Sequence, residues 1–455
     1  MTRSRVRGFI AAWAVLGTAF ATATGTVAAQ EAATYRLTMG DAARLAAQRA
    51  APVLEARARA DAADARARQT VADLLPSLDA DIATGGRTFN TASFGLDFPT
   101  PVGQAPFFDP NGEVVGPVNS ADVRASAEVP LLDLAAFGRR RSARASANAE
   151  RLAERSAASR AAAGAARAYL ATLRSRAEVE AREEDLKLAQ DLLEVARGIL
   201  AAGVGVAIDV TRAEGQVAAI RSQLLIAQNR GDVSELALRR ALRLAPTDDI
   251  ELTDALDGMT VAELPSPDDA VSRALENRSD LEMTTAYRVA AEQSLSATRA
   301  GRLPRVVGRV DDGYYGKEFG HLLNTYTWSV RVSVPLFDGF QRSGRVDEQR
   351  ARMRELDYQI EALEEDVEFQ VRQALLNLSA AQEQAVAAEE RRRLAQLEVD
   401  QEEERVRAGV AGTADVIRAA VLLNGARTGM LDALTAVQTS RLALAEATGT
   451  IGEIP

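Results

Sequence analysis

The residues best able to do chemistry in this chain are few and widely spaced. His321 is the only histidine, and a lone histidine is more often exposed to solvent than used as a base or a metal ligand. Acidic clusters occur at Asp311-Asp312 and at Glu402-Glu403-Glu404, but no candidate base accompanies either cluster. The sequence has no cysteine, no glycine-rich phosphate loop, no Ser-His-Asp set and no zinc-ligand spacing. These observations argue against an enzyme, and they predict neither a cofactor nor a metal site.

The net charge and the first residues restrict the class of protein further. The 455-residue chain has a formal net charge of −10, which disfavours nucleic acid as a partner. Three arginines in the first seven residues precede an apolar stretch, 8–21, that is too short to span a bilayer. Small residues at 27–29 resemble a cleavage site. We therefore expect residues 1–29 to be a secretory signal peptide. An exported chain without cysteine has neither disulfides nor a cysteine-linked lipid anchor.

The rest of the sequence repeats itself. Val129-Pro130-Leu131-Leu132-Asp133 returns as Val334-Pro335-Leu336-Phe337-Asp338, and Gly203-Val204 with Asp209-Val210 returns as Gly409-Val410 with Asp415-Val416. Such self-similarity over a long period indicates a duplicated structural unit. We expect each unit to contain a helix, two strands and a long helical hairpin. The predicted divisions after the signal peptide are a first repeat at 30–246, a linker at 247–267, a second repeat at 268–448 and a tail at 449–455.

Long proline-free stretches predict unusually long helices. The stretches from Arg139 to about Leu200 and from Gln341 to about Ala408 would each form a helix of about 90–100 Å. Each is followed by Gly-Val and a return helix, at about 206–244 and 413–448, which predicts an antiparallel hairpin with a tight tip. Opening helices are expected at 40–71 and 268–299. Pro52 indicates a late start or a kink in the first of these.

Four short stretches change from helical to alternating periodicity, at 78–82, 123–129, 306–310 and 326–334. One apolar and one charged face is typical both of a membrane barrel with a wet lumen and of a soluble sheet with one solvated face. The signal peptide and the long helices favour the membrane. Glycine and proline predict long loops at 87–120 and 312–324. Since a barrel needs about eight strands or more, the chain must oligomerise, with about twelve strands from three copies or about eight from two.

The duplication, the Val-Pro-Leu-x-Asp strand ends and the Gly-Val…Asp-Val hairpin tips resemble the TolC-like outer membrane efflux proteins of Gram-negative bacteria, over about 35–448. The resemblance implies a mixed α+β fold and a homotrimeric 12-stranded outer-membrane β-barrel continued by a long α-helical periplasmic barrel. A mixed belt would include 246–267 and the C-terminus. The implied function is a passive exit duct of a tripartite efflux pump or type I secretion system. Its partners would be a periplasmic adaptor, an inner-membrane pump of RND or ABC type, and outer membrane lipid.

The resemblance also assigns roles to the hairpin tips. Residues matching the adaptor-docking tips are Gly203, Val204, Gly409 and Val410. Asp415 matches an aspartate that narrows the periplasmic entrance, and Asp209 is its counterpart in the first hairpin; three carboxylates on a three-fold axis would attract cations. Some members carry an arginine two residues after the tip glycine and a second aspartate three residues after the first. Those places hold Ala411 and Arg418 here, so Arg418 is expected to pair with Asp415 or with Asp209.

Charged strand positions would line the duct. They are Asp79, Asp81, Arg124, Glu128, Arg309 and Arg331. The arginine run at 139–141 follows a predicted strand; it either contacts lipid head groups or the mouth of the lumen, or simply begins a solvated helix. A soluble periplasmic coiled-coil adaptor or scaffold is the alternative to a duct. The sequence leaves open the cargo, the identity of the adaptor and pump, and what locks a resting gate.

Overall fold

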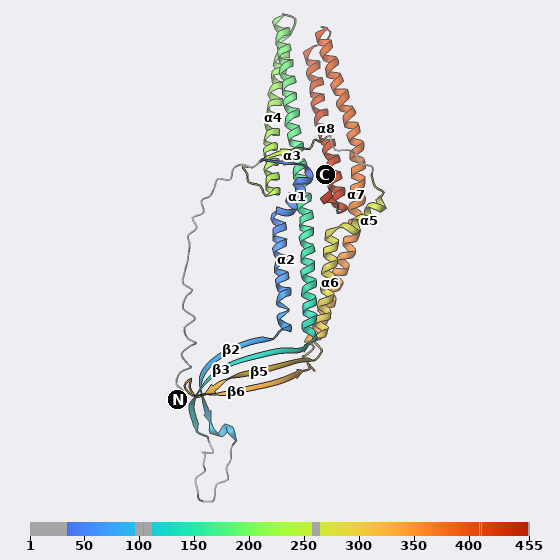
Figure 1. Cartoon of the computed structure of the whole chain (residues 1–455). Coiled ribbons are helices and arrows are strands. Elements are labelled where there is room, and N and C mark those ends of the chain that lie inside the picture. Colours follow the sequence, from blue (N-terminus) through green and yellow to red (C-terminus); the bar gives the residue numbers. More distant parts are fainter. Residues whose placement is uncertain are drawn as a thin grey trace.

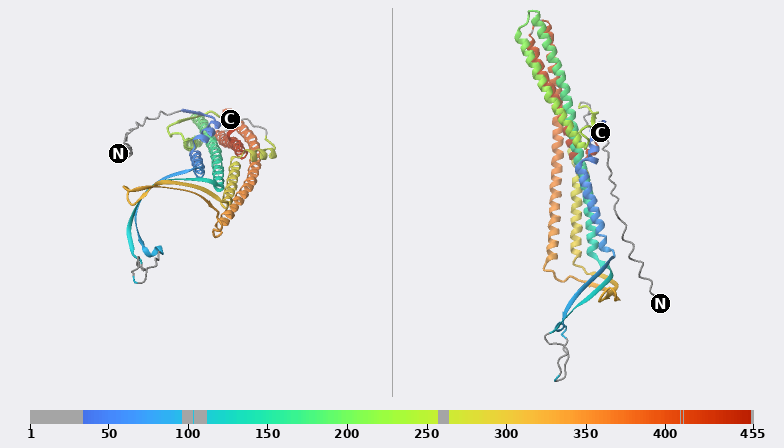
Figure 2. Two further views of the ribbon diagram at one scale, coloured as in Figure 1. Left: turned by 60° about the horizontal axis from the view of Figure 1, so that its bottom comes forward. Right: turned by 90° about the vertical axis from the view of Figure 1, so that its left-hand side faces the viewer.

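The computed structural model describes residues 34–95, 103, 112–256, 264–408, 410 and 412–453. The predicted signal peptide lies outside these residues, as do Gly409 and Ala411. Long helices run side by side along one axis, with a curved sheet at one end and two helical hairpin tips at the other (Figures 1 and 2). Among the described residues, no helix combines the length and the apolarity that crossing a membrane requires.

Four long helices form the two hairpins. In the first, α3 (Leu134–Ala201) has 68 residues and returns as α4 (Ala207–Leu242). In the second, α7 (Gln341–Arg407) has 67 residues and returns as α8 (Thr413–Ala447). These bounds lie close to those predicted, because no proline interrupts either run and a glycine-containing turn ends it. The second halves of α3 and α7 pair with their return helices, whereas the first halves continue toward the sheet (Figure 1).

Both opening helices are broken. The first consists of α1 (Met39–Arg49) and α2 (Ala51–Gln69), separated at Ala50 ahead of Pro52, as the proline predicts. The second consists of α5 (Pro267–Asn277) and α6 (Ser279–Ala300), and its break at Arg278 was not predicted, since no proline lies there. At this break the Arg278 guanidinium donates to both oxygens of Asp280 and to Gln370, which fixes the bend by side-chain pairing.

The main sheet is antiparallel, with the strand order β2-β3-β5-β6. Its strands are β2 (Ser77–Asn90), β3 (Val114–Asp133), β5 (Arg305–Gly316) and β6 (Leu322–Ser333). The first three strands extend beyond the predicted segments at both ends, whereas β6 begins four residues earlier and ends one residue before its predicted end. The expected loop at 312–324 shrinks to a turn at 317–321 because Gly316 still pairs with Leu322. Gly313 and Gly316, which suggested a loop, instead allow the neighbouring backbone to approach closely. A Cβ on Gly313 would stand 2.4 Å from the carbonyl oxygen of Val123.

A second, two-stranded sheet lies at the middle of the molecule. The strands β1 (Thr34–Leu37) and β4 (Asp249–Leu252) pair in parallel, although nearly all of the predicted first repeat lies between them. Short 3₁₀ turns complete the described structure at η1 (Ala72–Leu74), η2 (Thr91–Phe94) and η3 (Ile451–Glu453). The pairing of β1 with β4 holds the first described residues beside the long helices.

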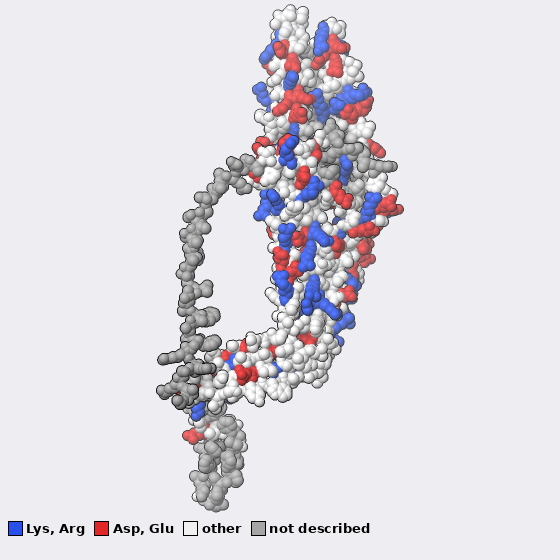
Figure 3. Space-filling view, in the orientation of Figure 1, with Lys and Arg blue, Asp and Glu red and all other residues white. Residues whose placement is uncertain are grey.

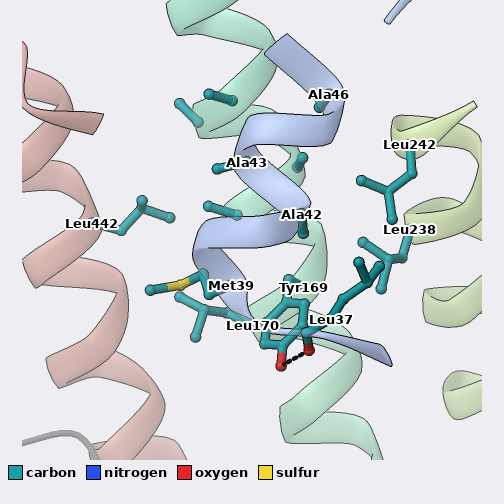
Figure 4. Packing of buried hydrophobic residues seen from close by; sticks show 14 of the residues in the cluster. Leu37, Met39, Ala42, Ala43, Ala46, Tyr169, Leu170, Leu238, Leu242 and Leu442 are labelled. Carbon is teal, nitrogen blue, oxygen red and sulfur yellow. Dashed lines mark hydrogen bonds between the residues drawn. The ribbon is translucent and has the colours of Figure 1, made fainter. Parts of the chain in front are cut away.

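The largest hydrophobic core surrounds this small sheet (Figure 4). Small residues of α1, including Ala42, Ala43 and Ala46, are almost fully buried against α3. At the centre Tyr169 is fully buried, and its hydroxyl donates to the carbonyl oxygen of Leu37 over 2.9 Å. Leucines from α3, α4 and α8 close around this group. The core therefore joins both hairpins to β1 and α1. It lies about midway between the main sheet and the hairpin tips.

Candidate functional site: sheet face and hairpin tips

The register of the main sheet places the six predicted lining residues on a single face. Asp81 pairs with Arg124, Glu128 pairs with both Ser77 and Arg309, and Arg331 lies opposite Val307. Because side chains alternate along a strand, every second residue from these pairs shares their face, and Asp79 is one of them. The charged groups expected from sequence are thus brought together, from four strands, on one surface.

The opposite face of the same sheet is apolar and exposed. Leu78, Ile82, Trp328, Val330 and Val332 all lie on it, each with more than half of its surface exposed. A contiguous apolar face of this kind marks a surface made to contact another protein or lipid. One polar pair lies within this face, where the Asn324 amide, level with Ile82, donates to Asp312 over 3.2 Å.

Ion pairs organise the polar face. Arg124 donates to Asp311 in a short contact and lies 3.4 Å from Asp122, while its second nitrogen donates to Thr325 over 3.3 Å. Arg124 thus connects β3 with β5 and with β6. Sequence reasoning identified Arg124 but discounted the Asp311-Asp312 pair, whose first member turns inward and is buried. The alternation of side chains around Asp311 was the signal that could have identified it.

The edges of the sheet are open. Within the described residues β2 and β6 are the outer strands, and each pairs on one side only. An open edge presents unpaired backbone N–H and C=O groups, which are satisfied by water or by another strand. The sheet thus combines two open edges with an exposed apolar face in the part of the chain that is described.

The tip of the first hairpin is a glycine turn. Gly203 adopts a φ of +78°, and the amide of Val204 donates to the carbonyl oxygen of Ile199 over 3.3 Å. This is the left-handed arrangement that ends a helix and reverses the chain. It leaves the Val204 side chain 81% exposed at the extremity of the molecule.

The second tip has the same hydrogen bond. The amide of Val410 donates to the carbonyl oxygen of Arg405 over 3.0 Å, and the Val410 side chain is 68% exposed. The predicted tip glycine Gly409 lies outside the described residues. Each tip therefore projects an apolar side chain into solvent.

The tip aspartates lie in the first turn of each return helix, where a negative charge is favourable. Asp415 pairs with Arg418 over 3.3 Å, and Asp209 pairs with Arg212 over 3.3 Å. Each arginine thus pairs with the aspartate of its own helix, three residues earlier. Of the two partners expected for Arg418, the structure shows Asp415, and the partner of Asp209 was missed.

A polar seam joins the two hairpins between the tips and the core. Asp185 of α3 is fully buried, and it accepts from Arg182 and from Arg427 of α8, each over 2.9 Å. The Asn424 amide, with its nitrogen turned toward Asp185, donates over 2.6 Å. Burial raises the pKa of the Asp185 carboxyl, while the hydrogen bond and charge of Arg427 oppose that rise. Nearer the core, Arg174 of α3 donates to Asp432 of α8 over 2.6 Å.

The model of one known family matches most of this chain. The family is described as outer membrane efflux protein, and its match covers residues 42–242 and 270–450, which together hold the sheet, both hairpins and both tips. The chain belongs to the outer membrane efflux protein family. It is accordingly a protein of the outer membrane that extends into the periplasm, as the resemblance in its sequence implied.

Individual relatives agree in fold. The outer membrane efflux protein BepC of Brucella suis is 26% identical over 296 residues, which are 63% of this chain and 62% of that relative. Among solved structures, a membrane protein from Pseudomonas aeruginosa has a TM-score of 0.76 at 18% identity, covering 90% of this chain and 93% of the other. VceC of Vibrio cholerae has a TM-score of 0.71 at 19% identity, covering 90% and 96%. The MtrE channel of Neisseria gonorrhoeae, solved in its open state, has a TM-score of 0.74 at 17% identity, covering 90% and 88%.

Proposed function

We propose that this protein is the exit duct of a tripartite efflux pump or type I secretion system. Three copies close their four-stranded sheets into a 12-stranded barrel in the outer membrane, and their helices form a second barrel through the periplasm. The observation that carries the proposal is the sheet itself. It has two open edges and one exposed apolar face, and its other face carries charges on all four strands. Closure by neighbouring copies satisfies the edges, while lipid covers the apolar face.

The polar face then lines the lumen. Asp79, Asp81, Arg124, Glu128, Arg309 and Arg331 stand along it. Acidic and basic groups alternate across the strands, as at Asp81 and Arg124. Mixed charge along a wide, wet passage suits polar solutes of either sign. The mechanism is conduction, with energy supplied by an inner-membrane pump of RND or ABC type.

The hairpin tips form the periplasmic entrance. The exposed side chains of Val204 and Val410 offer apolar contacts to a periplasmic adaptor. Three copies of Asp415 around the axis form a ring that narrows the entrance, and Asp209 flanks it. Because Arg418 pairs with Asp415 in each copy, it partly offsets the repulsion between the three carboxylates.

A soluble periplasmic scaffold is disfavoured by the same sheet. A soluble protein with so many apolar side chains exposed on one face, among them Leu78 and Trp328, would aggregate unless another surface covered it. The test is reconstitution of the purified chain in planar bilayers. Stable single-channel steps support the duct, whereas a protein that leaves the bilayer electrically silent and stays in the soluble fraction contradicts it.

A further inference from the structure

The arginines of this acidic chain gather where the helices meet the sheet. Between Asp133 and Glu150 the sequence has four arginines and no acidic residue, and between Glu292 and Asp311 it has four more and again no acidic residue. These stretches contain the start of α3 and the end of α6, which both lie at the sheet end of the molecule (Figure 1). Local charge at this junction is therefore opposite in sign to that of the whole chain.

Close packing holds the two stretches together. Gly138 of α3 lies so near Ala297 of α6 that a Cβ on the glycine would stand 2.7 Å from the Ala297 Cα. Along α3, Arg141 lies about one turn and Arg144 nearly two turns beyond this contact, while Arg299 lies near the end of α6 and Arg302 just past it. We call these four residues the arginine collar.

Within the described part of the chain, the collar residues have no side-chain partner. All four are exposed or partly exposed at the junction, and among the described residues no ion pair or side-chain hydrogen bond engages them. By contrast, Arg139 in the adjoining turn pairs with Asp73 over 2.9 Å. Arginines that lack an internal acidic partner are available to an external anion. Figure 3 shows blue side chains on the helices just above a sheet that is largely white in that view.

The collar directly follows an exposed apolar surface. Leu131 of β3 lies over Gly308 on the apolar face of the sheet, within 3.5 Å of where a Cβ would stand. Phe137 is 48% exposed and lies one turn before Arg141, so the two share a helix face. Apolar side chains followed along one face by arginine are typical of the boundary between membrane hydrocarbon and phosphate head groups.

We propose that the arginine collar binds the phosphate groups of anionic phospholipids in the periplasmic leaflet of the outer membrane. This rests on the proposed function, which places the sheet in the membrane. The planar guanidinium matches a phosphate with two parallel hydrogen bonds, which an ammonium group does not offer. Lipid fits better than a protein or nucleic acid partner, because the basic residues continue an apolar face of membrane type. The collar thereby fixes how deeply each protomer sits in the bilayer.

The test compares lipids of different charge on the full chain. The double variant Arg141→Gln/Arg144→Gln is matched by a control, Arg221→Gln/Arg391→Gln, which removes two exposed arginines of α4 and α7 far from the sheet. Each purified protein is titrated in nonionic detergent with phosphatidylglycerol or phosphatidylcholine, and the melting temperature is recorded. Inorganic phosphate at equal concentration distinguishes a lipid site from a general anion site.

Phosphatidylglycerol should raise the melting temperature of the wild type and of the control more than phosphatidylcholine does. The difference between the two lipids should shrink at high salt. The collar variant should need on the order of tenfold more phosphatidylglycerol for the same rise. An equal response of variant and wild type overturns the proposal, as does an equal rise with inorganic phosphate. The single variant Arg144→Gln repeats the test if the double variant folds poorly.

Flotation with vesicles distinguishes a failure of the proposed duct from a failure of the arginine collar alone. If wild type fails to associate with any vesicle, the proposed function itself is wrong. If wild type and variant both insert and respond identically to both lipids, the duct stands and only the collar is wrong. If both insert but only the variant loses the response to phosphatidylglycerol, the collar is supported.

Discussion

Asp185 of α3 and Arg427 of α8 form an ion pair across the two hairpins, with Oδ1 and Nη1 2.9 Å apart. The Asp185 side chain is fully buried, so this contact joins the first and second units through a carboxylate with no access to water. A buried carboxylate is tolerated only where donors surround it, and here both arginines and the Asn424 amide supply them.

Replacing Asp185 with alanine should lower the free energy of unfolding by about 3–5 kcal/mol, because it removes the buried carboxylate that Arg182 and Arg427 share and leaves them only Thr428 and the exposed Glu184. Urea unfolding in detergent, followed by the helical circular dichroism signal, measures the loss. Asp400→Ala removes an exposed carboxylate of α7 and should change stability by less than about 0.5 kcal/mol. Equal stability of the two variants would show that the seam contributes nothing.

Tyr169→Phe should destabilise the protein by about 1 kcal/mol. The hydroxyl donates to the Leu37 carbonyl, which also accepts from Thr253, and it accepts from the partly buried Asp254 amide, so its removal takes one donor from the carbonyl and the acceptor from that amide. Burial also raises the pKa of Tyr169 to about 12, which keeps the hydroxyl protonated across the physiological range. The melting temperature is the measurement, and Tyr358→Phe, on a tyrosine that is 69% exposed, is the control. A drop as large in the control would refute the role of this bond.

Asp415→Ala should raise single-channel conductance in planar bilayers and weaken block by divalent cations, because the ring of carboxylates at the entrance is gone. Arg418→Ala should instead strengthen block by divalent cations, since it releases the Asp415 carboxylate from its 3.3 Å pair. Asp232→Ala, on the exposed surface of α4, serves as the control. Unchanged conductance and block in both tip variants would rule out the ring.

Gly203→Val should abolish export while trimer formation and outer-membrane location stay intact. A β-branched residue at a φ of +78° costs about 1–2 kcal/mol or more, and it distorts the tip that meets the adaptor. Gly215→Ala, in the open interior of α4, is the control and should export normally. The readout is survival of cells in the presence of those toxic compounds to which loss of this protein sensitises them. Normal survival with Gly203→Val would mean that the tip is not a docking site.

Periodicity in the sequence predicted most of the regular structure. Proline-free runs ending in glycine predicted α7 and the end of α3 to within one residue, although α3 begins at Leu134, five residues before the predicted start, and alternation predicted the faces of the four strands. Strand ends were predicted less well, because Gly313 and Gly316 resemble loop residues until the close approach of a neighbouring strand is known. The pairing of β1 with β4 was not predictable, since four residues in each strand carry too little pattern to specify a distant partner.

The candidate site was predicted in the same uneven way. Alternation brought the six charged strand residues to one face, but whether they line a lumen stays a prediction. Asp185 was missed because an aspartate in a helix rich in Arg and Glu looks like part of a solvated surface. Its burial depends on the packing of α8 against α3, which no local pattern encodes. The break at Arg278 was missed for a similar reason, because it rests on pairing with Asp280 and Gln370.

The central claim is that one protomer supplies only a third of a closed barrel. The most direct test is the native mass of the protein extracted from the outer membrane in mild detergent. The full chain has a mass of 48.5 kDa, and the account predicts a complex of three chains, each lacking residues 1–29. A monomer or dimer that is soluble without detergent would contradict barrel closure by three copies, and with it the duct.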